Sequence, residues 1–210
     1  MHAGTLLQSS QAALAVLGKS HILDTSYLAG GSALALHLGH RKSFDFDFYY
    51  PGALFAEDII KQLAGIGTFK VTLLEPPHTV LGIFNNIKFS IFRYTYPMIG
   101  EFTLYQNIRV ASVADIAAMK LTAITGRATK RDYVDLYVIS QKYRFEELFD
   151  FYEKKFGNLG NNRYAIIRAM GYFDDAESDE MPKMIHSFSW EEVKTFLSDE
   201  SIRLAKKYLE

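Results

Sequence analysis

The sequence contains no cysteine. Disulfide bonds, thiolate metal sites and cysteine nucleophiles are therefore excluded, and any catalysis must use carboxylates, histidine, lysine, serine, or a metal held by oxygen and nitrogen ligands. The chain also lacks any run near the roughly 18 apolar residues that a membrane-spanning helix needs. Its first residues lack the basic stretch and apolar core of a secretion signal. We therefore expect a cytoplasmic protein with no membrane partner.

The chain has little excess of charge of either sign, because 23 basic residues face 24 acidic ones and the net charge is −1. A polyanionic partner would therefore have to be bound by local basic clusters, since the chain as a whole provides no attractive field. The 49% hydrophobic and 22% charged residues are typical of a globular protein. A chain of 210 residues can bury one sizeable core or two small ones.

Helices and strands alternate in the first half of the chain. The apolar periodicity predicts helices over residues 5–17, 32–38 and 56–64, and strands over residues 26–29, 44–48, 69–74, 80–84, 87–94 and 106–110. The Asn85-Asn86 pair between two of these strands indicates a hairpin.

The second half is predicted to be helical throughout. From Ser112 the apolar period changes to about 3.6, and the capping pattern Ser112-x-x-Asp115 introduces a helix that runs through Thr125. Further helices are predicted at residues 131–141, 145–156, 161–171, 189–197 and 199–209, with an acidic loop at 174–180. We therefore predict an α+β fold, with a mixed β-sheet flanked by helices over residues 1–110 and a C-terminal helical bundle over residues 111–210.

The strictly alternating stretch Phe44-Asp45-Phe46-Asp47-Phe48 is the most informative in the chain. Side chains of a strand point to opposite faces in turn, so the pattern predicts one aromatic face and one acidic face. Asp45 and Asp47 would then be close enough for both carboxylates to bind one divalent ion, Mg²⁺ or Mn²⁺. Phosphoryl and nucleotidyl transfer need such an ion. An Asp-x-Asp pair alone, however, is more often a solvated strand face.

The upstream Gly30-Gly31-Ser32 stretch makes a metal site more probable than the aspartates alone do. A glycine turn that opens a helix presents unpaired backbone N–H groups and a positive dipole end, which together favour a phosphate. The alternative is an ordinary strand-to-helix turn capped by Ser32. Arg41, between that helix and the aspartates, could bind a phosphate with its planar guanidinium or pair with a nearby acid.

A strand, a Gly-Gly-Ser turn, a short helix and then a strand with Asp-x-Asp is the pattern of the DNA polymerase β-like nucleotidyltransferase superfamily. Within it, residues 28–47 closely resemble the first motif of the AbiEii/AbiGii nucleotidyltransferase toxin family. That family has a second signature, Lys-x-x-Ala-x-x-x-Arg followed by Asp-x-x-Asp-Leu. The matching residues here are Lys120, Ala123, Arg127, Asp132, Asp135 and Leu136.

The spacing of the second motif adds a physical argument. Residues seven apart project from nearly the same face of a helix, so Lys120 and Arg127 could bind a triphosphate together. Because buried cations need counter-charges, these two either face a ligand or pair with the acids that follow them. We expect Asp132 and Asp135 to orient these cations. Arg131 and Asp135 also have the spacing of a helical ion pair.

The resemblance implies a metal-dependent nucleotidyltransferase that acts as a toxin and transfers a nucleotide from an NTP to an acceptor, plausibly tRNA. A cognate antitoxin is then expected as a partner. In this interpretation Asp45, Asp47 and Lys120 are the catalytic residues, and Asp45 and Asp47 hold the metal. The nucleotide is bound by Gly30, Gly31, Ser32, Arg41, Lys120 and Arg127. Of these, Lys120 and Arg127 act from a cleft shared by the two domains. The supporting residues are Arg131, Asp132 and Asp135.

One part of the superfamily pattern is missing. A third carboxylate usually lies on a neighbouring strand, and the corresponding stretch from Ile87 to Arg93 carries no acid on either face. Glu75 or Glu101 could replace it only if the strands bend suitably. The alternatives are therefore a nucleotide- or RNA-binding protein that has lost catalysis, or a phosphotransferase that uses the same metal site.

Overall fold

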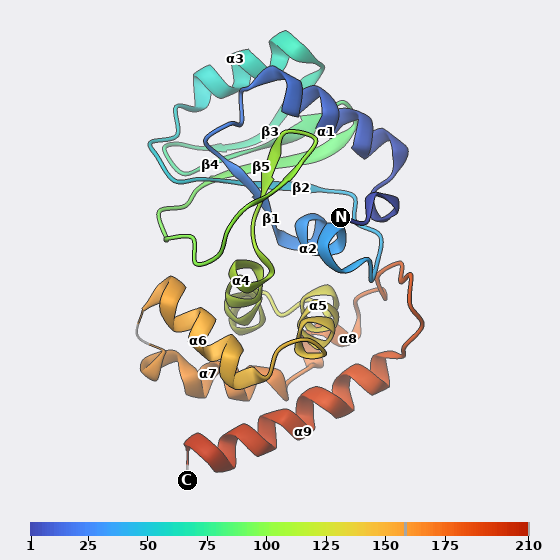
Figure 1. Ribbon diagram of the computed structural model, residues 1–210, viewed down its shortest axis with the longest axis vertical. Helices are drawn as coiled ribbons and strands as arrows, with labels where there is room; N and C mark the ends of the chain where they lie inside the picture. Colours follow the sequence, from blue (N-terminus) through green and yellow to red (C-terminus); the bar gives the residue numbers. More distant parts are fainter. Residues whose placement is uncertain (158, 210) are drawn as a thin grey trace. The chain divides into compact units, whose positions relative to one another are not determined.

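The computed structural model describes residues 1–157 and 159–209 (Figure 1). The chain divides into two compact units, Met1–Ser112 and Val113–Glu210. Each unit is described by itself below.

The first unit contains a short 3₁₀ helix, three α-helices and seven strands among its described residues. The helices are η1 (Ala3–Thr5), α1 (Gln8–Ser20), α2 (Gly30–Leu38) and α3 (Ala56–Ile66). The strands are β1 (Tyr27–Ala29), β2 (Phe46–Tyr50), β3 (Phe69–Glu75), β4 (Thr79–Phe84), β5 (Ile87–Arg93), β6 (Thr103–Tyr105) and β7 (Ile108–Val110).

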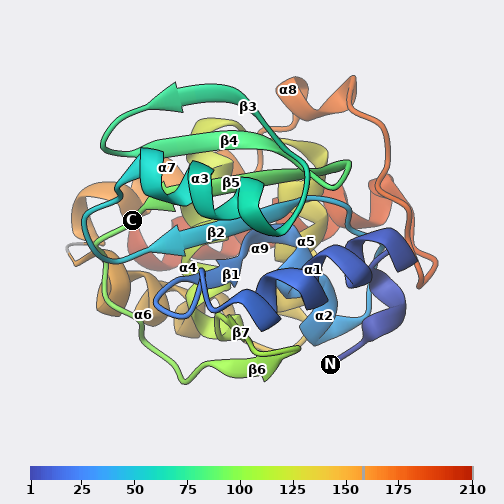
Figure 2. The same ribbon diagram turned by 90° about the horizontal axis from the view of Figure 1, so that it is seen from above.

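These strands form one mixed sheet in the order β3-β4-β5-β2-β1-β7-β6. The strand β2 pairs in parallel with β5 and antiparallel with β1, and β1 pairs in parallel with β7. Helices α1 and α3 lie on the same face of this sheet (Figure 2). Phe46 and Phe48 of β2 are fully buried, whereas the alternate residues Asp47 and Tyr49 are half-buried. The predicted division of β2 into an aromatic face and an acidic face is therefore confirmed for Asp47.

Two hairpin turns in this sheet use non-glycine residues with a left-handed backbone. The predicted hairpin at Asn85-Asn86 is confirmed, with φ angles of 46° and 66° that match a type I′ turn. The predicted strand over residues 106–110 is confirmed only for Ile108–Val110, which form β7. Gln106 and Asn107, with φ angles of 51° and 62°, instead form the turn of a second hairpin between β6 and β7.

The second unit consists of helices among its described residues. They are α4 (Val113–Gly126), α5 (Lys130–Ser140), α6 (Phe145–Phe156), α7 (Gly160–Met170), α8 (Asp174–Glu177) and α9 (Trp190–Tyr208). The two helices predicted at residues 189–197 and 199–209 are one continuous helix, α9, and the predicted acidic loop contains the short helix α8. None of the helices in the described part of the chain is both long and apolar enough to cross a membrane.

The core of the second unit combines aliphatic packing with a buried ion pair. The α4 residues Ile116, Ala117 and Leu121 are fully buried. Beside them, Lys155 of α6 binds Asp115 of α4 at 2.8 Å, and both side chains are completely inaccessible to solvent. The fold as a whole is the predicted mixture of a mixed sheet with helices, followed by a helical bundle.

Candidate functional site

The Asp47 carboxylate lies against the first residue of α2. Gly30 begins this helix with a left-handed φ of 66°, and a Cβ placed on it would come within 2.8 Å of Asp47 Oδ2. Glycine is favoured at this position, because the left-handed backbone angle is costly for other residues and an added Cβ would displace the Asp47 carboxylate. A carboxylate that can bind a cation therefore adjoins a helix N-terminus, which favours an anion.

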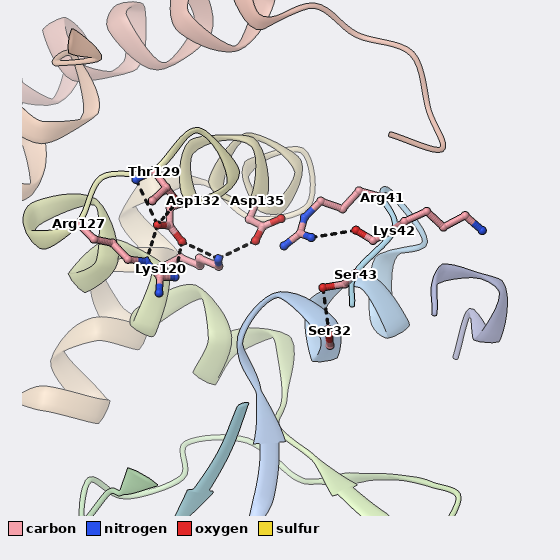
Figure 3. Close-up of polar contacts among 9 residues, drawn as sticks. All are labelled: Ser32, Arg41, Lys42, Ser43, Lys120, Arg127, Thr129, Asp132 and Asp135. Atoms are coloured by element: carbon pink, nitrogen blue, oxygen red, sulfur yellow. Dashed lines mark hydrogen bonds and ion pairs between the residues drawn. The ribbon is translucent and has the colours of Figure 1, made fainter. Parts of the chain in front are cut away.

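Gly31 is required by a second close approach, from Arg41. A Cβ on Gly31 would collide with the guanidinium of Arg41, whose side chain is buried. Arg41 Nη1 also donates to the backbone carbonyl of Lys42 at 3.1 Å (Figure 3). The predicted Arg41 is thus held against the glycine turn by packing.

Ser32 connects α2 to the segment that leads into β2. Its buried hydroxyl donates to the backbone carbonyl of Asp45 and lies 3.0 Å from the hydroxyl of Ser43 (Figure 3). The hydroxyl forms no cap to the helix, so the alternative of a plain capping serine is wrong. Ser32 instead fixes the backbone position of Asp45. Sequence pattern did not indicate the Ser43 contact, because it joins a residue of α2 to one eleven residues later in the loop before β2.

The two aspartates have different positions relative to β2. Strand β2 begins at Phe46, so Asp47 lies within it and Asp45 immediately precedes it, in contrast to the predicted strand over residues 44–48. Both side chains are half-buried. Two carboxylates suit Mg²⁺ or Mn²⁺, because Mg²⁺ commonly takes one or two protein carboxylates and completes its shell with water and substrate phosphates. The donor set at this position therefore fits the predicted metal.

The neighbouring strand offers no third carboxylate. Asp47 is in register with Ser90 of β5, so a serine occupies the position next to it. Glu75 is exposed at the end of β3, the edge strand, with β4 and β5 between it and β2, and Glu101 is exposed outside the strands. Among the described residues, no group of three His, Asp or Glu side chains could hold a metal.

The cations of the second motif pair with the acids that follow them. Lys120 of α4 is buried, and its ammonium binds Asp132 at 2.8 Å and Asp135 at 2.6 Å (Figure 3). Both aspartate side chains are fully buried on α5. The sequence allowed Lys120 either to face a ligand or to pair with the acids that follow it, and in the structure it pairs with these acids.

Arg127 completes this cluster from its edge. Its Nε and Nη2 each donate to Asp132 at 2.8 Å, although 65% of the side chain remains exposed. Thr129, which precedes α5, also donates to Asp132 through its hydroxyl at 2.7 Å. The capping pattern Thr129-x-x-Asp132 was readable in the sequence and could have indicated this contact.

The charges around Asp132 perturb its protonation. Burial by itself raises the pKa of Asp132, but the charges and hydrogen bonds of Lys120 and Arg127 outweigh it and hold that pKa well below its ordinary value. Asp132 is therefore ionised at neutral pH. The proposed ion pair between Arg131 and Asp135 is wrong. Within the part of the chain that the structure describes, Arg131 is exposed and makes no ion pair, because Asp135 points into the cluster toward Lys120.

Solved structures share this fold across nearly the whole chain. MenT4, a nucleotidyltransferase toxin from Mycobacterium tuberculosis, has a TM-score of 0.61 at 16% identity and covers 97% of this chain and 87% of its own. JHP933 from Helicobacter pylori has a TM-score of 0.58 at 18% identity, with 94% and 90% covered. The fold is therefore that of nucleotidyltransferases of this type.

The sequence comparison is more specific. Residues 81–206 match the family described as nucleotidyl transferase AbiEii toxin, type IV toxin-antitoxin system. An uncharacterized protein from Aquifex aeolicus is 35% identical over 195 residues, which cover 90% of each chain. This chain therefore belongs to the AbiEii family of nucleotidyltransferase toxins. The matched span contains β5 and the second motif, whereas the Gly30 to Asp47 motif precedes it.

Proposed function

We propose that this protein transfers a nucleotide from an NTP to an acceptor such as tRNA, in a reaction that depends on Mg²⁺ or Mn²⁺. The observation that carries the proposal is the contact between the Asp47 carboxylate and Gly30 at the N-terminus of α2. This contact brings a cation ligand beside a backbone turn suited to a phosphate. The substrate of such a site is a phosphate compound bound together with a divalent metal.

Asp45 and Asp47 would hold the metal, and Ser32 keeps Asp45 in place through its backbone carbonyl. A divalent ion in such a site neutralises phosphate charge and stabilises the in-line transition state. Gly30 and Gly31 would bind the phosphates through the turn that opens α2, with Arg41 packed behind Gly31. The chain's own contribution is to fix the two carboxylates and the turn before the substrate binds.

In the second motif we assign different roles to the two cations. Arg127 has a largely exposed side chain, so we propose that it binds substrate phosphate. Lys120 is buried between Asp132 and Asp135 and therefore acts first as the charge that holds these two acids together. Asp132 in turn positions Arg127, and its low pKa keeps this contact ionic at neutral pH. Arg131 is exposed and takes no part in this cluster.

The type IV toxin-antitoxin description of the family supports a further proposal, that growth inhibition by this protein is opposed by a cognate antitoxin. Co-expression of a neighbouring gene product that restores growth, without a change in the toxin's abundance, is the expected result. Growth that is unaffected by expression of this protein alone would contradict the toxin role.

A second candidate is binding without transfer, and the observation that favours it is Ser90 at the register position next to Asp47. A third is phosphoryl transfer from the same site. Product analysis separates the three, because nucleotidyl transfer releases pyrophosphate, phosphoryl transfer leaves a nucleoside diphosphate, and binding alone gives neither.

The test is incubation of the purified protein with Mg²⁺, total bacterial tRNA and each α-labelled or γ-labelled NTP in turn. Nucleotidyl transfer predicts that label from one α-labelled NTP enters tRNA, whereas γ-label leaves as pyrophosphate. Label that enters an acceptor only from the γ position would replace this proposal with the phosphotransferase. No product with any NTP, with nucleotide binding retained, would favour the binding protein.

A further inference from the structure

A cavity of about 340 Å³ lies in the second unit, between the C-terminal end of α4 and helix α7. Its hollow comes from small residues on both sides, Gly126 and Ala128 from the α4 end and Ala165 and Ala169 from α7. The volume falls within the range of about 300–1,000 Å³ that small-ligand sites occupy. None of its lining residues has a role in the function proposed above.

Two tyrosines and an arginine surround this hollow. Tyr164 and Arg168 are one turn apart on α7, about 6 Å along the helix axis, and Tyr172 follows the helix end. Tyr164 is 60% exposed and Tyr172 is 44% exposed, although both are large aromatic residues. Aromatic rings and an arginine beside one another on an open surface are the arrangement on which unpaired nucleic-acid bases stack.

The second motif holds both walls of the cavity in place. Gly126 and Ala128 flank Arg127, whose guanidinium binds Asp132, and Ala128 has an unusual left-handed φ of 44°. On the other wall, the hydroxyl of the buried Tyr133 lies 3.1 Å from the backbone carbonyl oxygen of Ala169 and 2.5 Å from that of Tyr172, and these two acceptors share its one proton. Hydrogen bonds therefore connect both walls of the cavity to α5, which carries Asp132 and Tyr133.

We propose that this cavity binds an unpaired nucleotide of an RNA acceptor. The base stacks on Tyr164 and Tyr172, and the backbone phosphate lies toward the cations Arg168 and Arg127. Asp175, at the cavity edge, accepts hydrogen bonds from base amino groups. Both tyrosines are exposed, which suits an RNA strand that continues beyond the cavity. A free nucleotide, in contrast, is usually enclosed by its protein pocket. This inference rests on the proposed function, since it names where that reaction's acceptor binds.

The experiment measures the affinity of the full-length protein for a fluorescently labelled single-stranded oligoribonucleotide by anisotropy, with no NTP or Mg²⁺ present. Tyr164→Ala and Tyr172→Ala are each expected to weaken binding about 10-fold, because stacking on one aromatic side chain contributes that order of affinity. Tyr164→Phe keeps the ring and is expected to bind like the native protein. Tyr96→Ala removes a similarly exposed tyrosine from the first unit and serves as the matched control.

Affinities within twofold of native for both alanine variants would overturn the inference. So would a mononucleotide that binds more tightly than the oligoribonucleotide and depends on the same tyrosines, because the site would then take a free nucleotide. The assay is independent of transfer. RNA binding that depends on the tyrosines, in a protein that transfers no label, would reject the proposed function and retain the cavity assignment. Transfer of label, with RNA binding unchanged in the alanine variants, would retain the proposed function and reject the cavity assignment.

Discussion

Replacing Asp132 by asparagine tests the charge cluster of the second motif. The native carboxylate accepts hydrogen bonds from Lys120 at 2.8 Å and from two nitrogens of Arg127 at 2.8 Å each, and it is fully buried. Asparagine has nearly the same shape but has lost the charge, and its amide nitrogen would face cationic donors. The net charge of the cluster that contains Lys120, Arg127, Asp132 and Asp135 then rises by one.

The loss in free energy of unfolding depends on how well Lys120 and Arg127 can replace their contacts with the lost carboxylate. Breaking a buried ion pair typically costs about 3–5 kcal/mol. Lys120 keeps its contact with Asp135, and the exposed part of Arg127 can be hydrated by water, so we expect the lower end, about 3 kcal/mol. Arg127→Gln removes only the exposed partner and is expected to cost less than about 1 kcal/mol.

The assay is urea unfolding followed by the fluorescence of Trp190, which is the only tryptophan in the sequence and lies in the second unit. Asp24→Asn, at an exposed residue that pairs with His21, is the matched control and is expected to leave stability unchanged. An Asp132→Asn protein as stable as the control would refute the assignment of Asp132 as the centre of this cluster.

The pH dependence gives an independent check on the same residue. The pKa of Asp132 is lowered in the folded state, so its contribution to stability is fully present above its unfolded pKa of about 4. That contribution is lost as the pH falls through the folded pKa. The native protein is therefore expected to lose stability on acidification below about pH 4, and Asp132→Asn is expected to lack this part of the loss.

Three further substitutions probe the packing and the site. Lys155→Ala leaves a fully buried aspartate without its cation and is expected to cost about 3–5 kcal/mol in urea unfolding. Tyr133→Phe removes a hydroxyl that bonds to two half-buried backbone carbonyls and is expected to cost about 0.5–1.5 kcal/mol in the same measurement. Gly30→Ala is expected to reduce transfer about 100-fold or more, because the added methyl group displaces Asp47. Gly157→Ala, at a glycine with a similar φ of 73° and open space where the Cβ would lie, controls for backbone strain, and an equal loss of activity in both variants would contradict the role of the Asp47 contact.

The sequence was sufficient for features that depend on local pattern. Alternation around Asp47, the glycines that open α2 and the Asn85-Asn86 turn all follow from backbone geometry that a few adjacent residues determine. The hairpin at Gln106-Asn107 was missed because glutamine rarely adopts a positive φ, so the turn had no recognisable signal.

Features that depend on tertiary contacts were not predictable. The spacing of Lys120 was compatible with a ligand or with internal acids, and only the packing of α5 on α4 places Asp132 and Asp135 against it. Ser32 was predicted to bind phosphate, but its hydroxyl bonds to the carbonyl of Asp45, thirteen residues away. The predicted break between residues 197 and 199 is absent, and Ser201 in this polar stretch donates its hydroxyl to the backbone carbonyl of Ile167 on α7 at 2.7 Å.

The most direct test of the central claim compares nucleotide transfer by the native protein and by Asp47→Asn, with an α-labelled NTP, Mg²⁺ and tRNA. Asp24→Asn again provides the matched control for an aspartate outside the site. We expect label in tRNA with the native and Asp24→Asn proteins, and at least about a 100-fold lower rate with Asp47→Asn, since a metal ligand contributes several kcal/mol to the transition state. Transfer by Asp47→Asn at the native rate would contradict the assignment of this carboxylate, and of the turn beside it, as the centre of the reaction.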